Sequence, residues 1–207
     1  MPQDGTKLSP GGPLRIHPVS QSNTPSLSRA SVGVFLVEIL LPANQIHDRI
    51  HQLAGEITRT YQGREVTVIG ILSGCVIFLA DLIRQIDLPI RVGFLTASSY
   101  RGEATAPGQL VIRDELLPDL LDRDVLLIDD ILDTGKTLTR VVARLIDRGA
   151  RSVKVGVLLR KIGRQEVPFE PDFVGFTIPD RFVVGYGLDY NDKYRHLPYI
   201  GVLPTTN

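Results

Sequence analysis

The sequence has little cysteine, no net charge and no long apolar run, and each lack excludes a class of protein. Cys75 is the single cysteine, which excludes an internal disulfide framework and is typical of a reducing compartment. The 23 basic and 23 acidic residues cancel, so no overall charge favours nucleic acid or a membrane surface as a partner. The apolar run 32–41 contains Glu38 and is too short to span a membrane. With no signal-peptide pattern at its start, the chain is expected to be cytoplasmic.

The most informative stretch joins an apolar segment to two acids and a small polar turn. Residues 125–128 are all apolar and predict a buried parallel strand. Asp129 and Asp130 follow it, and the turn 133–137 leads into a helix. The apolar stripe of that helix consists of Leu138, Val141, Val142 and Leu145. Ligands bind beyond the carboxyl ends of strands in α/β sheets, and helix N-termini attract phosphate. The stretch therefore predicts a phosphate site beside two acids, which could hold a sugar hydroxyl or a metal ion.

Two familiar ligand-binding motifs are absent. A nucleotide P-loop has a glycine five positions before Gly135, and position 130 is an aspartate. An acidic strand end with a capped helix is a purely structural alternative, but two adjacent acids and Asp133 exceed what capping needs. His47 and His51 lie four residues apart without a third ligand, so they are expected to face solvent rather than a metal.

Strands and helices alternate between residues 44 and 159. This alternation predicts an α/β fold, a parallel twisted sheet flanked by helices. Besides the strand above, the expected strands are 32–41, 66–72, 89–96, 111–112 and 153–159. One helix is expected to begin at Asn44, as its capping residue, and to end at Tyr61, and a second to span 76–86.

Composition divides the chain into a tail and one domain. Residues 1–30 are rich in Pro, Gly, Ser, Thr and Gln and predict a disordered tail. The domain covers 31–207, with a core at about 43–159. Beyond the core, short extended pieces, prolines and aromatics replace the alternation. We therefore expect 160–207, together with 31–42, to form a small hood over the strand ends.

Two parts of the sequence resemble a known enzyme family. The stretch 129–137 resembles the 5-phosphoribosyl pyrophosphate (PRPP) signature of the type I phosphoribosyltransferases. The purine-binding end of the hypoxanthine-guanine phosphoribosyltransferases is similar to Lys161 and to residues 171–176, 178–186 and 188–191. The similarity runs from about Ile39 to Leu203. The first part indicates a superfamily, and the second is more specific because these enzymes differ there.

This resemblance implies a purine salvage enzyme, a glycosyltransferase acting on PRPP. Such an enzyme transfers the 5-phosphoribosyl group to hypoxanthine or guanine and releases IMP or GMP with pyrophosphate. Mg²⁺ is implied, because it binds through few carboxylates plus substrate phosphates. The candidate metal ligands are Asp129, Asp130 and Asp189. A homodimer or homotetramer is also implied, with no nucleic-acid or membrane partner.

On the PRPP side, the resemblance suggests a role for each matching residue. Asp129 and Asp130 would hold the ribose hydroxyls, although the family often has Glu first, and Asp129 is one methylene shorter. The 5′-phosphate would be bound by Asp133, Thr134, Gly135, Lys136 and Thr137. Asp133 is also the candidate general base or acid near purine N7. Pyrophosphate would be bound by Ser73, Gly74 and Arg195. Ser73 departs from the basic residue often found there, so its side-chain contact is an open question.

On the base side, the resemblance suggests how a purine is recognised. Phe182 would stack on the ring, the Val183 backbone would contact its edge, and Asp189 would lie beside the purine and the metal. Lys161 would donate to an oxygen at purine C6. Since an ammonium has no acceptor for the amino group of adenine, we expect activity on hypoxanthine and guanine and essentially none on adenine.

The polar loop 97–108 is long for a connection inside a compact domain. Such loops are usually functional, although a tolerated surface loop is the plainer alternative. Ser99 and Tyr100 match the family's lid dipeptide, which closes over the reacting centre. We therefore expect this loop to order when both substrates are bound.

Two other functions stay open. One is the same enzyme class with xanthine preferred over the other 6-oxopurines. The second is a transcriptional regulator that keeps the PRPP-binding fold but binds RNA or DNA, which should show a basic face or an added nucleic-acid domain. The sequence has neither feature, and it keeps Asp133 and Lys161.

Overall fold

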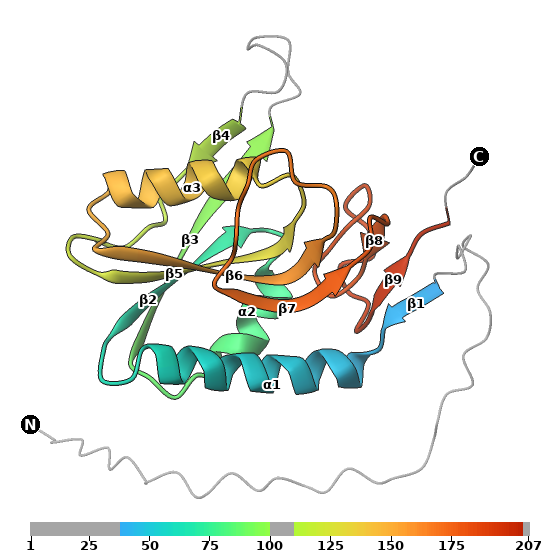
Figure 1. The fold of residues 1–207 in the computed structure, drawn as a ribbon, viewed down its shortest axis with the longest axis horizontal. Helices are drawn as coiled ribbons and strands as arrows, with labels where there is room; N and C mark the ends of the chain where they lie inside the picture. The colour runs from blue at the N-terminus through green and yellow to red at the C-terminus, as the bar shows by residue number, and fades with distance from the viewer. Residues whose placement is uncertain (1–37, 100–109, 205–207) are drawn as a thin grey trace, which may run out of the picture. The chain divides into compact units, whose positions relative to one another are not determined.

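The computed structural model describes residues 38–99 and 110–204 (Figure 1). The predicted tail 1–30, Tyr100 and most of the predicted lid loop lie outside these residues. In chain order the elements are β1 (Glu38–Leu41), α1 (Ala43–Thr60), β2 (Val66–Leu72), α2 (Val76–Ile83), β3 (Ile90–Ser99), β4 (Leu110–Arg113), β5 (Asp124–Leu132), α3 (Lys136–Asp147), β6 (Ser152–Lys161), β7 (Phe173–Ile178), β8 (Val183–Val184) and β9 (Ile200–Val202).

A six-stranded sheet forms the core, and its strands lie in the order β4-β3-β2-β5-β6-β7. All neighbours are parallel except β3 and β4, so the predicted α/β sheet flanked by helices is confirmed with one correction. β4 runs antiparallel to β3, with Ser99 opposite Leu110. The sequence between them offers no crossover helix, and a chain that returns without one can pair only in the antiparallel direction.

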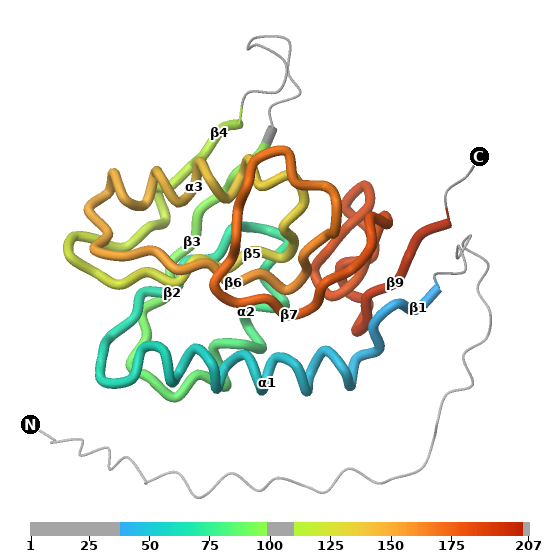
Figure 2. Tube along the Cα trace, viewed as in Figure 1, coloured from blue at the N-terminus to red at the C-terminus, as the bar shows by residue number. Residues whose placement is uncertain are grey.

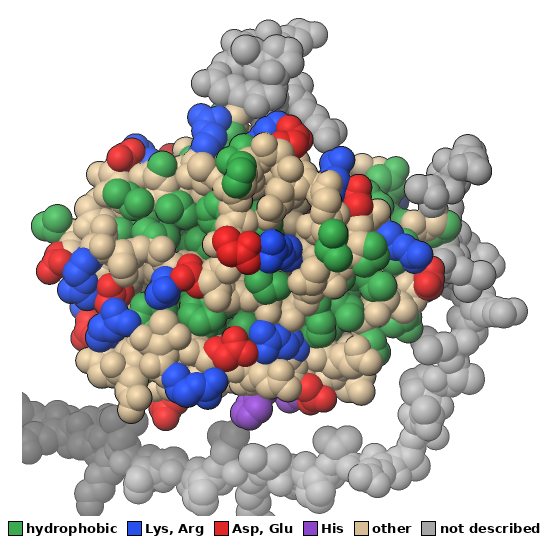
Figure 3. Space-filling model, in the orientation of Figure 1, with side chains coloured by type: hydrophobic (Ala, Val, Ile, Leu, Met, Phe, Trp, Pro, Cys, Tyr) green, Lys and Arg blue, Asp and Glu red, His purple; other side chains and the backbone are tan. Residues whose placement is uncertain are grey.

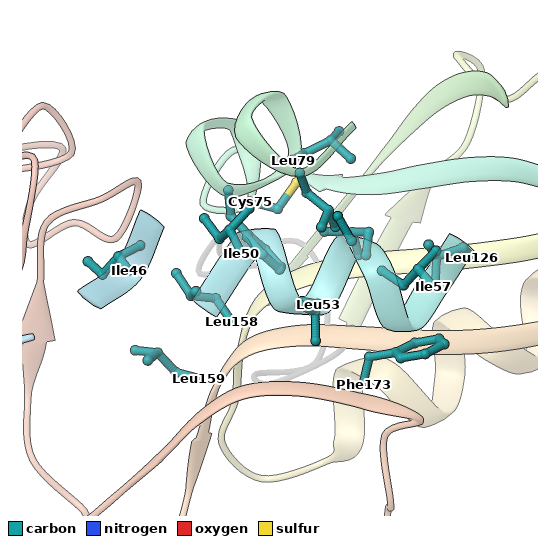
Figure 4. Close-up of a cluster of buried hydrophobic side chains, with 14 of the residues drawn as sticks. Ile46, Ile50, Leu53, Ile57, Cys75, Leu79, Leu126, Leu158, Leu159 and Phe173 are labelled. Carbon is teal, nitrogen blue, oxygen red and sulfur yellow. The ribbon is translucent and has the colours of Figure 1, made fainter. Parts of the chain in front are cut away.

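Helices cover both faces of this sheet (Figure 1). α1 and α2 pack on one face and α3 on the other, and each face has its own cluster of buried apolar side chains. Figure 4 shows Ile46, Ile50, Leu53 and Ile57 of α1 together with residues such as Leu126, Leu158 and Phe173 of the sheet. The spacing of three and four residues places these α1 side chains on one helical face. None of the helices in the described part of the chain is long and apolar enough to cross a membrane.

Several element boundaries differ from the sequence prediction. β3 continues to Ser99, so residues 97–99, which were expected to begin the polar loop, belong to a strand. α1 begins at Ala43, so Asn44 is inside the helix and Pro42 stands at the cap position without a side-chain hydrogen bond. A proline at this position loses no helical hydrogen bond, because the first amides of a helix have no intrahelical partner. α2 ends at Ile83 rather than near residue 86. β5 continues through both acids to Leu132 instead of ending before them.

A second, three-stranded sheet has the order β1-β9-β8. β1 pairs antiparallel with β9, so the first and last described strands lie side by side (Figure 2). This small sheet joins the two segments that the sequence assigned to the hood. The prediction was wrong for one part of the hood segment 160–207: β7 pairs with β6 and belongs to the six-stranded sheet. The sequence analysis missed this strand because it relied on alternating helices and strands, and a proline-containing loop replaces the helix before β7.

Candidate active site

The site lies at the carboxyl edge of the main sheet, between β2 and β5. From β2 the chain passes through α2 to β3, and from β5 it passes through α3 on the opposite face to β6. The two connections leave in opposite directions, which opens a crevice between these strand ends. A cavity of about 330 Å³ fills this position. Its lining includes Leu72, Gly74, Asp129, Asp130, Asp133, Thr134, Gly135 and Thr137.

Asp129 and Asp130 bring two carboxylates to the wall of this first cavity. They lie inside β5, and the Asp130 amide donates to Oδ1 of Asp129 at 3.0 Å. Burial, with the neighbouring Asp130 charge, raises the pKa of Asp129 well above its usual range. Burial likewise raises the pKa of Asp130. Two acids held this way favour a partner that brings hydroxyl donors or positive charge.

Gly74 places the turn after β2 directly against these acids. A Cβ added at Gly74 would lie 1.8 Å from Oδ2 of Asp130. On its other side, a Cβ at Gly187 would lie 2.2 Å from the Gly74 carbonyl oxygen, and Gly187 has φ +101°. The Leu72–Ser73 peptide is cis. Gly74 lines the cavity, whereas Ser73 does not, so the structure brings only one of these two predicted pyrophosphate residues to the cavity wall.

The turn before α3 forms another part of the same wall. Gly135 has φ +83°, and a Cβ there would lie 2.6 Å from the Val167 carbonyl oxygen, so glycine is required on both grounds. The Thr134 carbonyl accepts hydrogen bonds from the amides of Glu166 and Val167 at 3.0 and 3.1 Å. Lys136 does not line the cavity, because its ammonium is paired with Glu166. The first-turn amides of α3 have no intrahelical partner and suit an anion.

A second cavity of about 220 Å³ opens beside the first. Its lining contains all four residues predicted to contact the purine, together with one apolar side chain and three residues that also line the first cavity. The full lining is Asp130, Ile131, Asp133, Lys161, Phe182, Val183, Leu188 and Asp189. Phe182 is 49 % exposed and packs edge-on to Tyr190, with ring centroids 5.4 Å apart. The Phe182 ring is therefore not buried in the hydrophobic core.

Lys161 and Asp133 lie next to each other in the wall of this second cavity. The Lys161 side chain is only 11 % exposed, so it is not a surface lysine, and its Nζ lies 3.8 Å from Oδ2 of Asp133. Two further residues, which the sequence did not single out, complete the group. Arg164 Nε lies 3.1 Å from Oδ1 of Asp133, and Asp180 Oδ1 lies 3.3 Å from Lys161 Nζ. A sequence signal existed, since both are charged residues in turns that directly follow strands of the site.

Three of the remaining predicted residues lie at the edge of the site or beyond the described part. Arg195 lines neither cavity, but its guanidinium lies 2.7 Å from Asp189 and also donates to the Gly187 carbonyl at 2.7 Å. Ser99 ends β3, and nothing is described of its side chain or of Tyr100. His47 and His51 are exposed on α1. Among residues 38–99 and 110–204, no three His, Cys, Asp or Glu side chains form a metal-binding group.

Comparison with known proteins gives one consistent result. Residues 37–191 match the family model described as the phosphoribosyl transferase domain. The chain is 43 % identical over 167 residues to hypoxanthine phosphoribosyltransferase of Salmonella typhimurium, covering 80 % of this chain and 94 % of that protein. It is 41 % identical over 166 residues to a bifunctional TilS/HprT protein of Listeria innocua, covering 80 % of this chain but 26 % of that protein. A crystal structure of hypoxanthine phosphoribosyltransferase from Staphylococcus aureus superposes with a TM-score of 0.76 at 40 % identity, covering 82 % of this chain and 94 % of that one.

Proposed function

Since the chain belongs to the phosphoribosyl transferase domain family, we propose that it is a purine salvage enzyme of the hypoxanthine-guanine phosphoribosyltransferase type. It transfers the 5-phosphoribosyl group of PRPP to hypoxanthine or guanine and yields IMP or GMP with pyrophosphate. The observation that carries this proposal is the shared wall of the two cavities. Asp130, Ile131 and Asp133 line both, so a sugar in the first cavity and a base in the second meet beside Asp133.

The first cavity supplies what PRPP requires. The 5′-phosphate fits the turn from Asp133 to Thr137, where first-turn amides without an intrahelical partner and the glycine backbone allow close approach. The ribose hydroxyls fit the carboxylates of Asp129 and Asp130, which accept hydrogen bonds. Lys136 adds to phosphate binding only if it leaves Glu166.

The carboxylates also fit Mg²⁺. Asp129 and Asp130 are adjacent, buried hard-oxygen ligands without an ion-pair partner among the described residues, and Asp189 lies in the neighbouring wall. Mg²⁺ typically binds through one or two carboxylates plus substrate phosphates. When bound, it supplies charge stabilisation for the leaving pyrophosphate. Arg195, held by Asp189, offers a further positive charge on that side.

The second cavity supplies what a 6-oxopurine requires. Lys161 donates to the C6 oxygen, Phe182 stacks on the ring, and the backbone of Val183 contacts the edge. Adenine presents an amino group to the Lys161 ammonium, so a buried donor is left without an acceptor. Sites that depend on one hydrogen bond can discriminate by ~10⁴-fold.

Asp133 is positioned to move the proton. As pyrophosphate leaves C1 of the ribose, the purine N9 attacks and the ring must lose a proton. A carboxylate next to purine N7 accepts that proton, and such a group contributes ~10²–10⁴-fold in rate. Enclosure by the loop with Ser99 and Tyr100 would exclude water from the oxocarbenium-like centre.

One assay tests the proposed function. Purified protein is incubated with PRPP and Mg²⁺ and with each of hypoxanthine, guanine, xanthine and adenine, and the nucleotides are separated by chromatography. We expect both IMP and GMP and essentially no AMP. Preferential formation of the xanthine nucleotide would establish the xanthine-preferring alternative. No nucleotide from any base would refute the enzymatic function.

The remaining partners follow from the same proposal. We expect the protein to be cytoplasmic. We also expect it to form a homodimer or homotetramer, and light scattering on the purified protein measures its oligomeric state. On the face shown in Figure 3, acidic and basic side chains are interspersed, and no observation favours a nucleic-acid regulator. The Listeria relative carries a second activity in its name, and this chain spans only 26 % of it.

A further inference from the structure

We propose that Arg164 and Asp180 are positioning residues of the active site, and that each fixes one of the two groups that contact the purine. Arg164 orients Asp133, and Asp180 orients Lys161. This inference rests on the proposed function, because it deepens the roles of Asp133 and Lys161 in that reaction.

The four side chains form a closed ring of alternating charge. Arg164 Nε lies 3.1 Å from Asp133 and 3.7 Å from Asp180. Lys161 Nζ lies 3.3 Å from Asp180 and 3.8 Å from Asp133. Two acids and two bases give the ring no net charge. Every member therefore has two partners of opposite charge, which restricts its position more than a single pair would.

The ring spans three neighbouring strand ends. Asp133 follows β5, Lys161 ends β6, and Asp180 follows β7, and these strands are adjacent in the sheet. Arg164 belongs to the turn after β6. Parallel strands bring their carboxyl ends to the same edge, so this turn can reach across to both acids. The ring thus adds side-chain contacts to the backbone hydrogen bonds that already join these segments, such as those from the Glu166 and Val167 amides to the Thr134 carbonyl.

Arg164 leaves the useful oxygen of Asp133 available. The guanidinium Nε contacts Oδ1, while Oδ2 is the oxygen nearest Lys161. O6 and N7 are adjacent atoms on the edge of a 6-oxopurine. A Lys161 donor beside an Asp133 acceptor matches that pair of atoms. A general base is typically oriented by a third group, and Arg164 occupies this position.

Asp180 orients the Lys161 ammonium, as Arg164 orients the Asp133 carboxylate. The Lys161 side chain is 11 % exposed, and Asp180 is its nearer acid. Without Asp180, the Lys161 ammonium keeps only the more distant Asp133 carboxylate and is held less firmly in one position. Arg164 and Asp180 are themselves 48 % and 50 % exposed, so replacing them removes little buried apolar surface. A substitution at either position therefore tests orientation rather than folding.

The experiment compares steady-state kinetics of five variants, with PRPP and hypoxanthine varied in turn and with adenine as the second base. We expect Arg164→Gln to lower kcat by about 10-fold with KM for PRPP unchanged. We expect Asp180→Asn to raise KM for hypoxanthine by about 10-fold. It should also lower the ratio of kcat/KM for hypoxanthine to kcat/KM for adenine. Arg160→Gln is the control, since Arg160 is also ion-paired, with Glu170 at 2.7 Å, but lies outside the ring. It should stay within about 2-fold of wild type. Arg164→Lys and Asp180→Glu keep the charges and should recover part of each loss.

The outcomes separate this inference from the proposed function. An inactive wild-type protein would overturn both. An active wild type with unchanged kcat in Arg164→Gln, or unchanged KM in Asp180→Asn, would overturn the inference alone. If a variant melts at a lower temperature and the kinetic loss matches its unfolded fraction, the role is structural and the inference fails. A loss that persists in fully folded protein and is reduced by the charge-keeping substitution supports it.

Discussion

The two ends of β5 carry acids in opposite situations. At its start, Asp124 is 2 % exposed and is surrounded by donors: Arg151 and Ser152 lie at 2.7 and 2.6 Å, and Arg64 at 3.1 Å. Hydrogen bonds, chiefly from Arg151, lower the pKa of Asp124 to about 2. At the other end, Asp129 and Asp130 have no ion-pair partner among the described residues, and burial raises the pKa of both. Within the described residues, one strand therefore holds an ion-paired acid at one end and two acids without an ion pair at the other.

This difference separates an acid suited to stabilising the fold, Asp124, from two acids suited to binding a ligand, Asp129 and Asp130. A buried carboxylate with several charged donors is a stabilising group, and its loss leaves those donors unpaired. Two adjacent carboxylates without cations cost stability, because each disfavours the charge of the other. Such pairs are concentrated at functional sites, where a ligand can supply the missing charge or donors. The predictions below test this division from the largest expected effect to the smallest.

Asp133 belongs to the functional end, and its change should have the largest effect. In the proposed reaction Asp133→Asn removes the proton acceptor, so we expect kcat to fall by ~10²-fold or more while PRPP still binds. Asp122→Asn is the matched control at the opposite end, since Asp122 is 78 % exposed and asparagine tolerates its φ of 54°. The check is kcat from initial rates together with PRPP affinity by calorimetry. A near-normal kcat in Asp133→Asn would remove its role as general base.

Asp129→Asn should separate binding from stability. It removes one charged acceptor from the proposed ribose and metal site, so PRPP affinity should fall by ~10-fold or more. It also removes one of two buried like charges, so the free energy of unfolding should stay equal or rise. Asp129→Glu keeps the charge and should bind PRPP much more tightly than Asp129→Asn does. Calorimetry and urea unfolding measure the two quantities, and a clear loss of stability in Asp129→Asn would break the comparison.

Asp124→Asn should show the reverse pattern. Arg64, Arg151 and Ser152 would lose a charged acceptor, so the free energy of unfolding should fall by about 2 kcal/mol with kcat unchanged. Glu65→Gln is the control at the same end, because Glu65 is 65 % exposed and lies 3.7 and 3.8 Å from its two arginines. Such a pair contributes about 0–1 kcal/mol. If Asp124→Asn lowered kcat in fully folded protein, the two ends would not be independent.

Sequence reasoning recovered the acids and the phosphate turn because they are contiguous. The apolar run before Asp129, the glycine at 135 and the following amphipathic helix all lie within one short stretch, where local rules apply. The sheet followed from the same rules applied along the chain. The antiparallel β4 and the membership of β7 in the main sheet did not, because pairing direction and strand order depend on distant segments.

The charge partners of the site were also beyond the sequence. Lys136 was expected at the phosphate, but its pairing with Glu166 arises from a loop 30 residues away. Arg164 and Asp180 become visible only when the ends of β5, β6 and β7 are brought together. The resemblance to a family supplied roles for Phe182 and Asp189 that spacing alone does not give. Local pattern thus located much of the lining of the first cavity, and tertiary structure determined which charged groups lie beside it.

The smallest effect concerns pH and again isolates Asp124. Its pKa in the folded protein is about 2, and in the unfolded chain it is the ordinary value of about 3.9. Between these values the unfolded chain binds more protons, so stability falls as pH falls. The stabilisation that Asp124 provides is therefore complete above about pH 4 and is lost as pH approaches 2. Other acids titrate in the same range, so the quantity to measure is the difference in unfolding free energy between wild type and Asp124→Asn. Urea unfolding at pH 7, 5 and 3 should show this difference shrinking by about 1 kcal/mol. A difference that stays constant down to pH 3 would mean that the arginines do not hold Asp124 in its charged form.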